Sequence, residues 1–273
     1  MSPNDRSRDL QWGSFTERGP WELDPQSIRW LGSTQALRSQ ANAEVPVLTT
    51  PRRLPPGGRV ITVTINIVKA LAPWFIKKKR NKYVDRSASQ ADVSLRLRKA
   101  VETLGPTYIK LGQIISSGEG LFPPELVEQF KKCRDQVPAE PFSTVRQTVE
   151  QDLGARLEDV FEWFDEKELA AASIAQVHAA RLLTGEDVVV KVQRPRVASL
   201  VRKDLTVMAW IAPYLVGRIP ISALANPPAL VELFAETIVE ELDFRLEASN
   251  MLDVAAMLYD LGQEGYIVPR PHP

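Results

Sequence analysis

Apolar residues recur at helical spacing over much of the middle of the chain, which predicts a run of helices. The first helix begins near Ala91, and its apolar positions are Val93, Leu95, Leu97, Val101 and Leu104. Gly105-Pro106 interrupts this pattern, which resumes from Tyr108 to Ile115, and a further helix is predicted after Pro123-Pro124. We therefore expect a helical segment ahead of any sheet.

The spacing changes beyond Phe161 and indicates β-structure. Residues 168–181 are small and alternate, residues 184–187 have the composition of a turn, and residues 188–192 are a β-branched run that includes Lys191. β-branched residues fit a pleated sheet, and a short Gly-containing polar segment between two such runs favours a turn. These features predict a hairpin with a small-residue loop at its front.

Two more helices are predicted after the hairpin. One covers about Leu205 to Leu215, and the other is a single long helix from Asn226 to about Leu261. Asn226 provides an N-cap for the long helix, Pro227 suits its first turn, and Gly262 marks its end. The full pattern predicts an α+β fold, in which helices accompany a small antiparallel sheet.

The composition is that of a globular chain, and it excludes several classes of chemistry. Of 273 residues, 44% are hydrophobic and 25% are charged, and 34 basic residues balance 34 acidic ones. Zero net charge argues against a nucleic-acid-coating role, which needs an excess of positive charge. One cysteine (Cys133) and two histidines (His178 and His272) exclude an internal disulfide, a thiolate cluster, a multi-histidine metal centre and most Ser-His-Asp chemistry. We predict a reducing, cytosol-facing compartment and no metal ligands, and we interpret His178 as structural.

The first 86 residues contain two segments of different character. Residues 1–59 hold seven of the 21 prolines and end in Gly57-Gly58, so they are expected to form a poorly ordered arm. Residues 60–86 combine the apolar run from Val60 to Ile76 with a basic cluster, which consists of Lys77, Lys78, Lys79, Arg80 and Lys82. The run is too short and too polar to cross a membrane alone, because a spanning helix needs roughly 20 mostly apolar residues. Two interpretations stay open: a helix on an anionic membrane surface, and an ordinary docking helix with a solvated basic end.

A lysine and a group of acids suggest phosphate chemistry. Lys191 lies in a β-branched strand downstream of a small-residue loop, an arrangement that places an ammonium near the phosphates of a nucleotide. A buried lysine needs a carboxylate partner, and the predicted helix after Asn226 carries Glu240, Glu241, Asp243 and Glu247. Each feature has an ordinary alternative, which is an edge strand for the lysine and a solvated face for the acids.

A third feature is Lys110-Leu111-Gly112-Gln113. On a helix, Lys110 and Gln113 are three residues apart and project from one side. Gly112 between them costs about 1 kcal/mol of helix stability, which suggests that another backbone or a ligand approaches closely there.

Together and in this order, the three features resemble the UbiB/AarF-type atypical kinases, protein-kinase-like ATPases linked to quinone biosynthesis and lipid homeostasis. The matching strings are Lys-x-Gly-Gln at 110–113, Ala-Ala-Ala-Ser-Ile-x-Gln-Val-His at 170–178, the strand lysine, and Glu-Leu-Asp-Phe-x-x-Glu-Ala at 241–248. The resemblance covers the chain from about Ser87 onwards. It implies a protein-kinase-like N-lobe over residues 151–273, preceded by a helical extension over residues 87–150.

The resemblance also implies roles for particular residues. The alanine-rich loop replaces a glycine-rich loop and would bind ATP or ADP, with Mg²⁺, through Ala171, Ala172, Ser173, Ile174 and Ala175. Lys191 would pair with Glu247. The helix that carries Lys110 and Gln113 would fold over the active site and meet the two acids Glu241 and Asp243. Ala175 departs from the family, which commonly has glycine there; its methyl group narrows the backbone freedom of the loop, and we expect it to alter nucleotide preference or affinity.

The catalytic elements of a kinase do not follow the predicted helix that carries Glu247. No His/Asp-x-x-x-x-Asn string and no Asp-Phe-Gly occur after Asn250, and Asp243-Phe244-Arg245 lies on a predicted helix with arginine in place of glycine. We therefore expect that the second lobe, with its metal ligands, is missing from this chain. A longer chain or a partner chain would supply it, and this chain alone would not hydrolyse ATP by the family mechanism.

The main hypothesis is that this chain forms the ATP-binding part of an atypical kinase or ATPase, which supports quinone biosynthesis or lipid homeostasis. Its expected location is cytoplasmic, peripheral at the inner face of a membrane through the Lys77–Lys82 region. Two alternatives stay open. One is a non-catalytic membrane-surface or interaction module, and the other is a small-molecule phosphotransferase of kinase-like fold, against which the Lys110–Gln113 extension argues.

Overall fold

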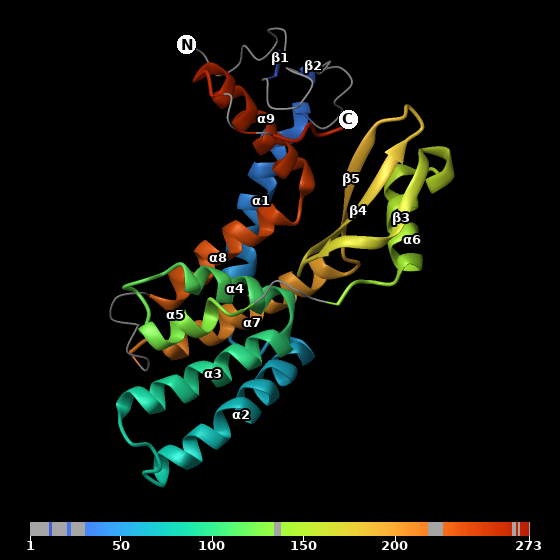
Figure 1. The fold of residues 1–273 in the computed structure, drawn as a ribbon. Coiled ribbons are helices and arrows are strands. Elements are labelled where there is room, and N and C mark those ends of the chain that lie inside the picture. The colour runs from blue at the N-terminus through green and yellow to red at the C-terminus, as the bar shows by residue number, and fades with distance from the viewer. Residues whose placement is uncertain are drawn as a thin grey trace. The chain divides into compact units, whose positions relative to one another are not determined.

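The chain forms two compact units in the computed structural model, which describes residues 11–12, 21–22, 31–133, 138–217, 226–263, 266 and 268–272. The larger unit is Leu48–Ala235, and the smaller one combines Met1–Val47 with Glu236–Pro273. The larger unit holds a group of helices and a three-stranded antiparallel sheet (Figure 1). The predicted α+β fold with a small antiparallel sheet and a helical extension is confirmed.

The helical part of the larger unit is centred on α3. Its elements are α2 (Gly57–Lys79), α3 (Arg86–Leu104), α4 (Pro106–Ser116), α5 (Pro124–Phe130) and α7 (Val197–Leu215). Helix α3 packs against α2, α4 and α5. The Asp85 carboxylate caps α3 by accepting a hydrogen bond of 2.7 Å from the backbone N–H of Ala88. Gly105, with a φ of 104°, separates α3 from α4, and Pro106 begins α4, so the predicted interruption at this dipeptide is confirmed.

The sheet consists of β3 (Phe161–Ala171), β4 (Ala175–Leu182) and β5 (Asp187–Gln193), in the order β3-β4-β5. Both strand pairs are antiparallel, and Val177 of β4 lies opposite Lys191 of β5. Gly185, with a φ of 84°, occupies the turn between β4 and β5. The predicted hairpin is confirmed, and β3 extends it into a three-stranded sheet.

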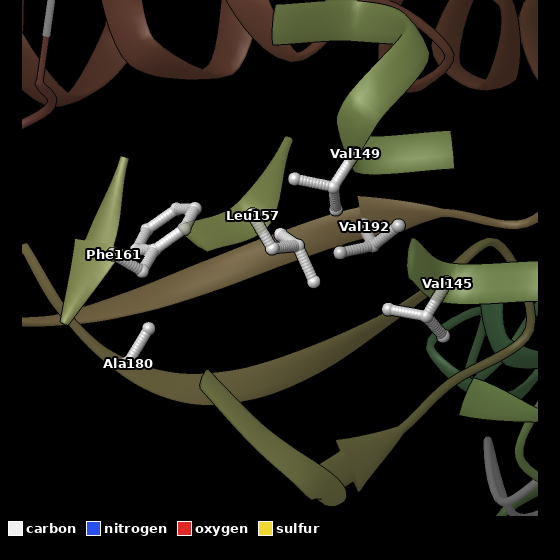
Figure 2. Close-up of a cluster of buried hydrophobic side chains, with 6 residues drawn as sticks. All are labelled: Val145, Val149, Leu157, Phe161, Ala180 and Val192. Atoms are coloured by element: carbon white, nitrogen blue, oxygen red, sulfur yellow. The ribbon is translucent and has the colours of Figure 1, made fainter. Parts of the chain in front are cut away.

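One face of the sheet packs against α6 (Phe142–Leu153), which precedes the short 3₁₀ turn η2 (Leu157–Asp159). Figure 2 shows the resulting core, which consists of Val145, Val149, Leu157, Phe161, Ala180 and Val192. Val188 and Val190 pack against the same cluster. Because side chains alternate along a strand, the residues between these valines, Val189 and Lys191, lie on the opposite face of the sheet.

The helical part is joined by one buried carboxylate, that of Asp204 in α7. Arg59 of α2 donates to it, with 2.6 Å between Nε and Oδ1, and the Thr107 hydroxyl of α4 donates to Oδ2 at 2.8 Å. Arg59 also donates to the carbonyl oxygen of Leu104 at the end of α3, at 2.7 Å. Asp204 is completely buried, and burial raises its pKa, while the bonds from Arg59 and Thr107 oppose that rise. The ion pair therefore makes a charge tolerable where four helices meet.

The long helix predicted from Asn226 to about Leu261 is two helices, so that prediction is wrong. Helix α8 (Pro227–Glu241) begins where expected, but the chain breaks before α9 (Phe244–Asp260). The Asp243 carboxylate caps α9 by accepting a 3.0 Å bond from the backbone N–H of Arg245. Aspartate favours this position over a helix interior because its carboxylate can bond to the unpaired N–H groups of the first turn.

The structure also differs from the predicted N-terminal arm. Residues Thr34–Thr49 form helix α1, preceded by a 3₁₀ turn, η1 (Leu31–Ser33). Alanine, leucine and glutamine recur in this segment and favour a helix despite Pro46. Two short strands, β1 (Gln11–Trp12) and β2 (Trp21–Glu22), pair in antiparallel fashion. The remainder of the arm up to residue 30 lies outside the described residues.

We expect Arg59→Met to destabilise the larger unit by about 3 to 5 kcal/mol, because it leaves the Asp204 carboxylate buried without its cation. The pKa of Asp204 in the folded chain lies above its unfolded value of about 3.9. Ionisation of Asp204 therefore lowers the free energy of unfolding as pH rises from the unfolded pKa through the folded pKa. The loss in the variant should therefore be larger at about pH 7.5 than at about pH 4.5. Denaturant unfolding at both values measures this.

A double variant, Arg59→Met with Asp204→Leu, serves as the control because it removes both charges. We expect it to recover much of the lost stability, since a well-packed apolar pair often replaces a buried ion pair without loss. An unfolding midpoint in Arg59→Met equal to that of the unaltered chain would contradict this account.

Candidate functional site

The face of the sheet opposite α6 carries the candidate site. Lys191 and Val189 lie on this face of β5, and both are exposed. The register places Val177 opposite Lys191 and Ala179 opposite Val189 on the neighbouring strand β4. The result is an apolar strip of small aliphatic side chains beside a lysine. Such a surface suits a ligand that has a flat apolar part and an anionic part.

The alanine-rich loop joins β3 to β4 at the end of the sheet near Lys191. Ala171 ends β3 and Ala175 begins β4, so the loop itself comprises only residues 172–174. The backbone N–H of Ala172 donates to the carbonyl oxygen of Ala175 at 2.8 Å, which closes the turn tightly. Ser173, Ile174 and Ala175 are all buried. Of the five residues predicted to form the loop, two are therefore strand residues that flank it.

The loop is held by Arg194, a residue that the sequence analysis did not select. Its guanidinium donates to the carbonyl oxygen of Ala172 at 2.8 Å and to the carboxylate of Glu140 at 3.1 Å. Its backbone N–H donates to the carbonyl oxygen of Ile174 at 2.9 Å. No local pattern signals these contacts, because Glu140 lies 54 residues away in the sequence.

Two buried polar residues of β4 strengthen the same region. The Gln176 side-chain oxygen accepts a bond of 2.8 Å from the backbone N–H of Glu140, and its amide nitrogen lies 2.9 Å from His178 Nε2. His178 Nδ1 lies 2.8 Å from the carbonyl oxygen of Asp165. A carbonyl only accepts, so Nδ1 carries the proton and Nε2 accepts from Gln176. Because His178 is completely buried and bonded through both nitrogens, its interpretation as a structural residue is supported.

The Lys110-Leu111-Gly112-Gln113 segment lies on α4, as predicted, with Lys110 and Gln113 both partly buried. Gly112 is explained differently from the prediction. A Cβ at this position would lie 2.7 Å from Cδ1 and 3.0 Å from Cε1 of Phe130, on α5. The absence of a side chain therefore admits an aromatic ring of the next helix, and neither a backbone nor a ligand is needed to account for the glycine.

The predicted acidic residues lie around the junction of α8 and α9. Glu241 ends α8, Asp243 caps α9, and Glu247 lies in the first turn of α9. The Asp243 carboxylate is bound by the Arg245 guanidinium, with contacts of 2.9 and 2.6 Å, and this hydrogen bonding lowers the pKa of Asp243. An acid at the start of α9 is also favoured by the helix dipole.

The predicted residues divide between the two units. Lys191, the alanine-rich loop, Lys110 and Gln113 belong to the larger unit, whereas Glu241, Asp243 and Glu247 belong to the smaller one. The pairings of Lys191 with Glu247, and of the α4 residues with Glu241 and Asp243, therefore stay predictions. Within the larger unit, the sheet places the loop and Lys191 together.

In the part of the chain that the structure describes, no three His, Cys, Asp or Glu side chains gather in a metal-binding arrangement.

The small sheet, the strand lysine beside a short alanine loop and the helical extension define the class: an α+β protein with the N-lobe of an atypical kinase. The family model for the ABC1 atypical kinase-like domain matches residues 132–270. The chain accordingly belongs to the ABC1 atypical kinase-like family, of UbiB/AarF type.

Curated relatives agree with this assignment. The chain is 34% identical over 214 residues to "Probable protein kinase UbiB" of Aeromonas salmonicida, covering 75% of this chain and 39% of the relative. It is 39% identical over 191 residues to a protein of the same name in Pseudomonas aeruginosa, covering 68% and 34%. It is 40% identical over 177 residues to a chloroplastic "uncharacterized aarF domain-containing protein kinase" of Arabidopsis thaliana, covering 63% and 32%. The chain thus spans about a third of the length of these relatives.

We expect Gly112→Ala to destabilise the larger unit by about 1 to 3 kcal/mol, because the added methyl group overlaps the Phe130 ring. This result would run against helix propensity, which favours alanine over glycine by about 1 kcal/mol. Adding Phe130→Leu should relieve the overlap, so the double variant should lose less than the sum of the two single changes. Thermal unfolding of the four proteins decides, and a Gly112→Ala chain as stable as the original would refute the packing argument.

Proposed function

We propose that the chain binds ATP or ADP on the exposed face of the sheet, as the nucleotide-binding part of an atypical kinase or ATPase. The observation that carries the proposal is the exposed Lys191 beside Val177, next to a loop of small residues. The membership in an atypical kinase-like family supports it. By analogy with kinases, the strand lysine would contact the phosphates.

Each part of the site has a proposed role. The aliphatic side chains of Val177 and Val189 would pack against the base, and the loop from Ala171 to Ala175 would lie over the phosphates. Glu247 would pair with Lys191 and hold its ammonium in one direction. Lys110 and Gln113 would form a cover that meets Glu241 and Asp243. Mg²⁺ would enter with the nucleotide.

The biological setting is also a proposal. Relatives that carry the name UbiB, together with the motifs of this chain, support a role in quinone biosynthesis or lipid homeostasis. The phosphoryl-transfer activity itself would belong to a longer protein or assembly of which this chain provides the nucleotide-binding part.

We expect Lys191→Met to weaken the binding of ATP and ADP about tenfold or more, because a hydrogen bond between charged groups contributes about 1.5 to 3 kcal/mol. Isothermal titration of the purified chain with each nucleotide and Mg²⁺ measures this. Lys167→Met is the matched control, since Lys167 is an exposed lysine on β3 of the same sheet. Equal affinity in Lys191→Met and the unaltered chain would refute the proposed site.

The pairing of Lys191 with Glu247 can be tested in the same titrations. Glu247→Gln should weaken nucleotide binding when Lys191 is present and should have little further effect in the Lys191→Met background, because coupled residues are not additive. Fully additive losses would show that these two side chains act independently.

A second proposed function is attachment to an anionic membrane surface through α2. Its exposed face carries a stripe of large apolar side chains at helical spacing, which consists of Ile61, Ile65, Val68, Phe75 and Ile76. The helix ends in Lys77, Lys78 and Lys79, and Lys78 lies 4.8 Å from the centre of the Trp74 ring. Apolar anchors with adjoining cations are typical of helices that lie in a membrane interface.

The length of α2 corrects the prediction that this segment is too short to cross a membrane. At 23 residues, α2 alone among the described helices meets the length and hydropathy requirements for spanning. Its contacts favour a position on the surface, because its inner side is bonded to the polar helix α3. Trp74 donates to the carbonyl oxygen of Ser89 at 3.2 Å, and Lys77 lies 3.8 Å from Asp92. We propose a cytoplasmic chain that is peripheral at the inner face of a membrane.

Vesicle co-sedimentation tests this second function. Lys79→Glu, Arg80→Glu and Lys82→Glu together should weaken binding to phosphatidylglycerol-containing vesicles by more than about tenfold, since each basic residue contributes about 1 kcal/mol near an anionic surface. A control with Lys132, Lys167 and Lys203 changed to Glu has the same net charge but leaves α2 intact. Equal sedimentation of the two triple variants would contradict a role in binding an anionic surface. So would binding of the unaltered chain to pure phosphatidylcholine vesicles that is as strong as its binding to phosphatidylglycerol-containing vesicles.

A further inference from the structure

Arg194 occupies an unusual position between the nucleotide-site lysine and the alanine-rich loop. It follows β5 directly and lies three residues after Lys191. Its side chain is almost fully buried, with a relative exposure of 7%, which is costly for a guanidinium unless its donors are satisfied. Its burial therefore points to a specific task.

The donors of Arg194 are directed to three backbone or side-chain acceptors around the loop. Nε donates to the carbonyl oxygen of Ala172 at 2.8 Å, Nη2 to that of Pro138 at 2.8 Å, and Nη1 to Glu140 Oε1 at 3.1 Å. The backbone N–H of Arg194 donates to the carbonyl oxygen of Ile174. Both ends of the three-residue loop are thus fixed by one residue.

This arrangement determines which backbone groups the loop turns outward. A trans peptide is planar, with its C=O and N–H pointing in opposite directions. Because the carbonyl of Ala172 points to Arg194, the N–H of Ser173 points away from the guanidinium. Carbonyl oxygens near a phosphate are repulsive, whereas N–H groups attract it.

Glu140 completes the arrangement and connects it to β4. Its carboxylate supplies the charge that Arg194 needs, and its backbone N–H is bonded to the buried Gln176 side chain at 2.8 Å. The segment at 138–140, the loop and the start of β4 are therefore linked through one ion pair. No atom of this network needs to touch a ligand in order to control the loop.

We infer that Arg194, with Glu140, is a positioning residue for phosphate recognition, which holds the alanine-rich loop so that the carbonyl groups of Ala172 and Ile174 face away from the nucleotide. The inference rests on the proposed nucleotide site. On this account, the affinity of the loop for phosphate depends on the Arg194 guanidinium, which bonds to the loop without contacting the nucleotide. A lysine at this position would keep the charge but could not reach three acceptors in one plane.

The test compares Arg194→Lys with Arg181→Lys, a control that changes a partly exposed arginine of the same sheet whose partner is Asp187. Titration with ATP, ADP and adenosine, together with amide hydrogen exchange of residues 172–175, provides the readouts. Arg194→Lys should weaken ATP and ADP binding about tenfold and speed exchange in the loop, because a single point charge replaces the fork. Adenosine binding should not change, since adenosine lacks phosphates. Arg181→Lys should match the unaltered chain throughout.

The outcomes separate the two proposals. If the unaltered chain binds no nucleotide, the proposed function fails and this inference fails with it. If the unaltered chain binds ATP and Arg194→Lys binds it equally well, the positioning role alone is overturned. An equal loss for adenosine and ATP would also overturn it, because general damage to the sheet would explain both. Glu140→Gln should also weaken ATP binding without affecting adenosine, but by less than Arg194→Lys. If Glu140→Gln binds ATP as tightly as the unaltered chain does, Glu140 has no positioning role.

Discussion

The two-residue period of β5 is the constraint on which the candidate site depends. Alternate valines of this strand must face α6 to fill the core, so the residues between them, including Lys191, are turned to the other side. Pairing with β4 then sets Val177 opposite Lys191. A slip of one residue would bury the ammonium in the core and expose the valines. The packing energy that folds the sheet therefore also fixes the direction of the lysine.

Two arginines, the partly buried Arg59 and the buried Arg194, fix other segments of the chain. Arg59 joins a carboxylate on α7 to the last carbonyl of α3, and Arg194 joins Glu140 to a carbonyl of the alanine-rich loop. In both cases a guanidinium binds one carboxylate and at least one backbone oxygen that lacks a regular partner. Helix ends and short loops leave such oxygens exposed, and a planar fork with five donors satisfies several at once. Hydrophobic contacts alone could not fix these segments.

Local signals account for the part of the structure that the sequence predicts. The β-branched run around Lys191 and the Gly105-Pro106 interruption depend on neighbouring residues, and both appear where expected. The sequence does not reveal the break at Asp243, because an apolar periodicity continues across it, although aspartate is a common N-cap. The reason for Gly112 is also hidden in the sequence, because no local pattern shows that Phe130 packs against it. The Arg194 contacts depend on residues far away in the chain and have no sequence signature.

Ala175, where the family commonly has glycine, lies in an ordered and buried part of the sheet. It begins β4, it pairs with Gln193, and its carbonyl accepts the bond that closes the loop. Its φ is not positive, so its conformation does not require glycine. The methyl group of Ala175 is buried, and it reduces the number of backbone conformations open to the unfolded chain. Alanine at such a site therefore stabilises the folded form by about 0.4 to 1 kcal/mol relative to glycine. The alanine therefore limits the backbone freedom at the end of a loop that Arg194 already holds, and both effects would favour preformation of the proposed nucleotide site over closure on binding.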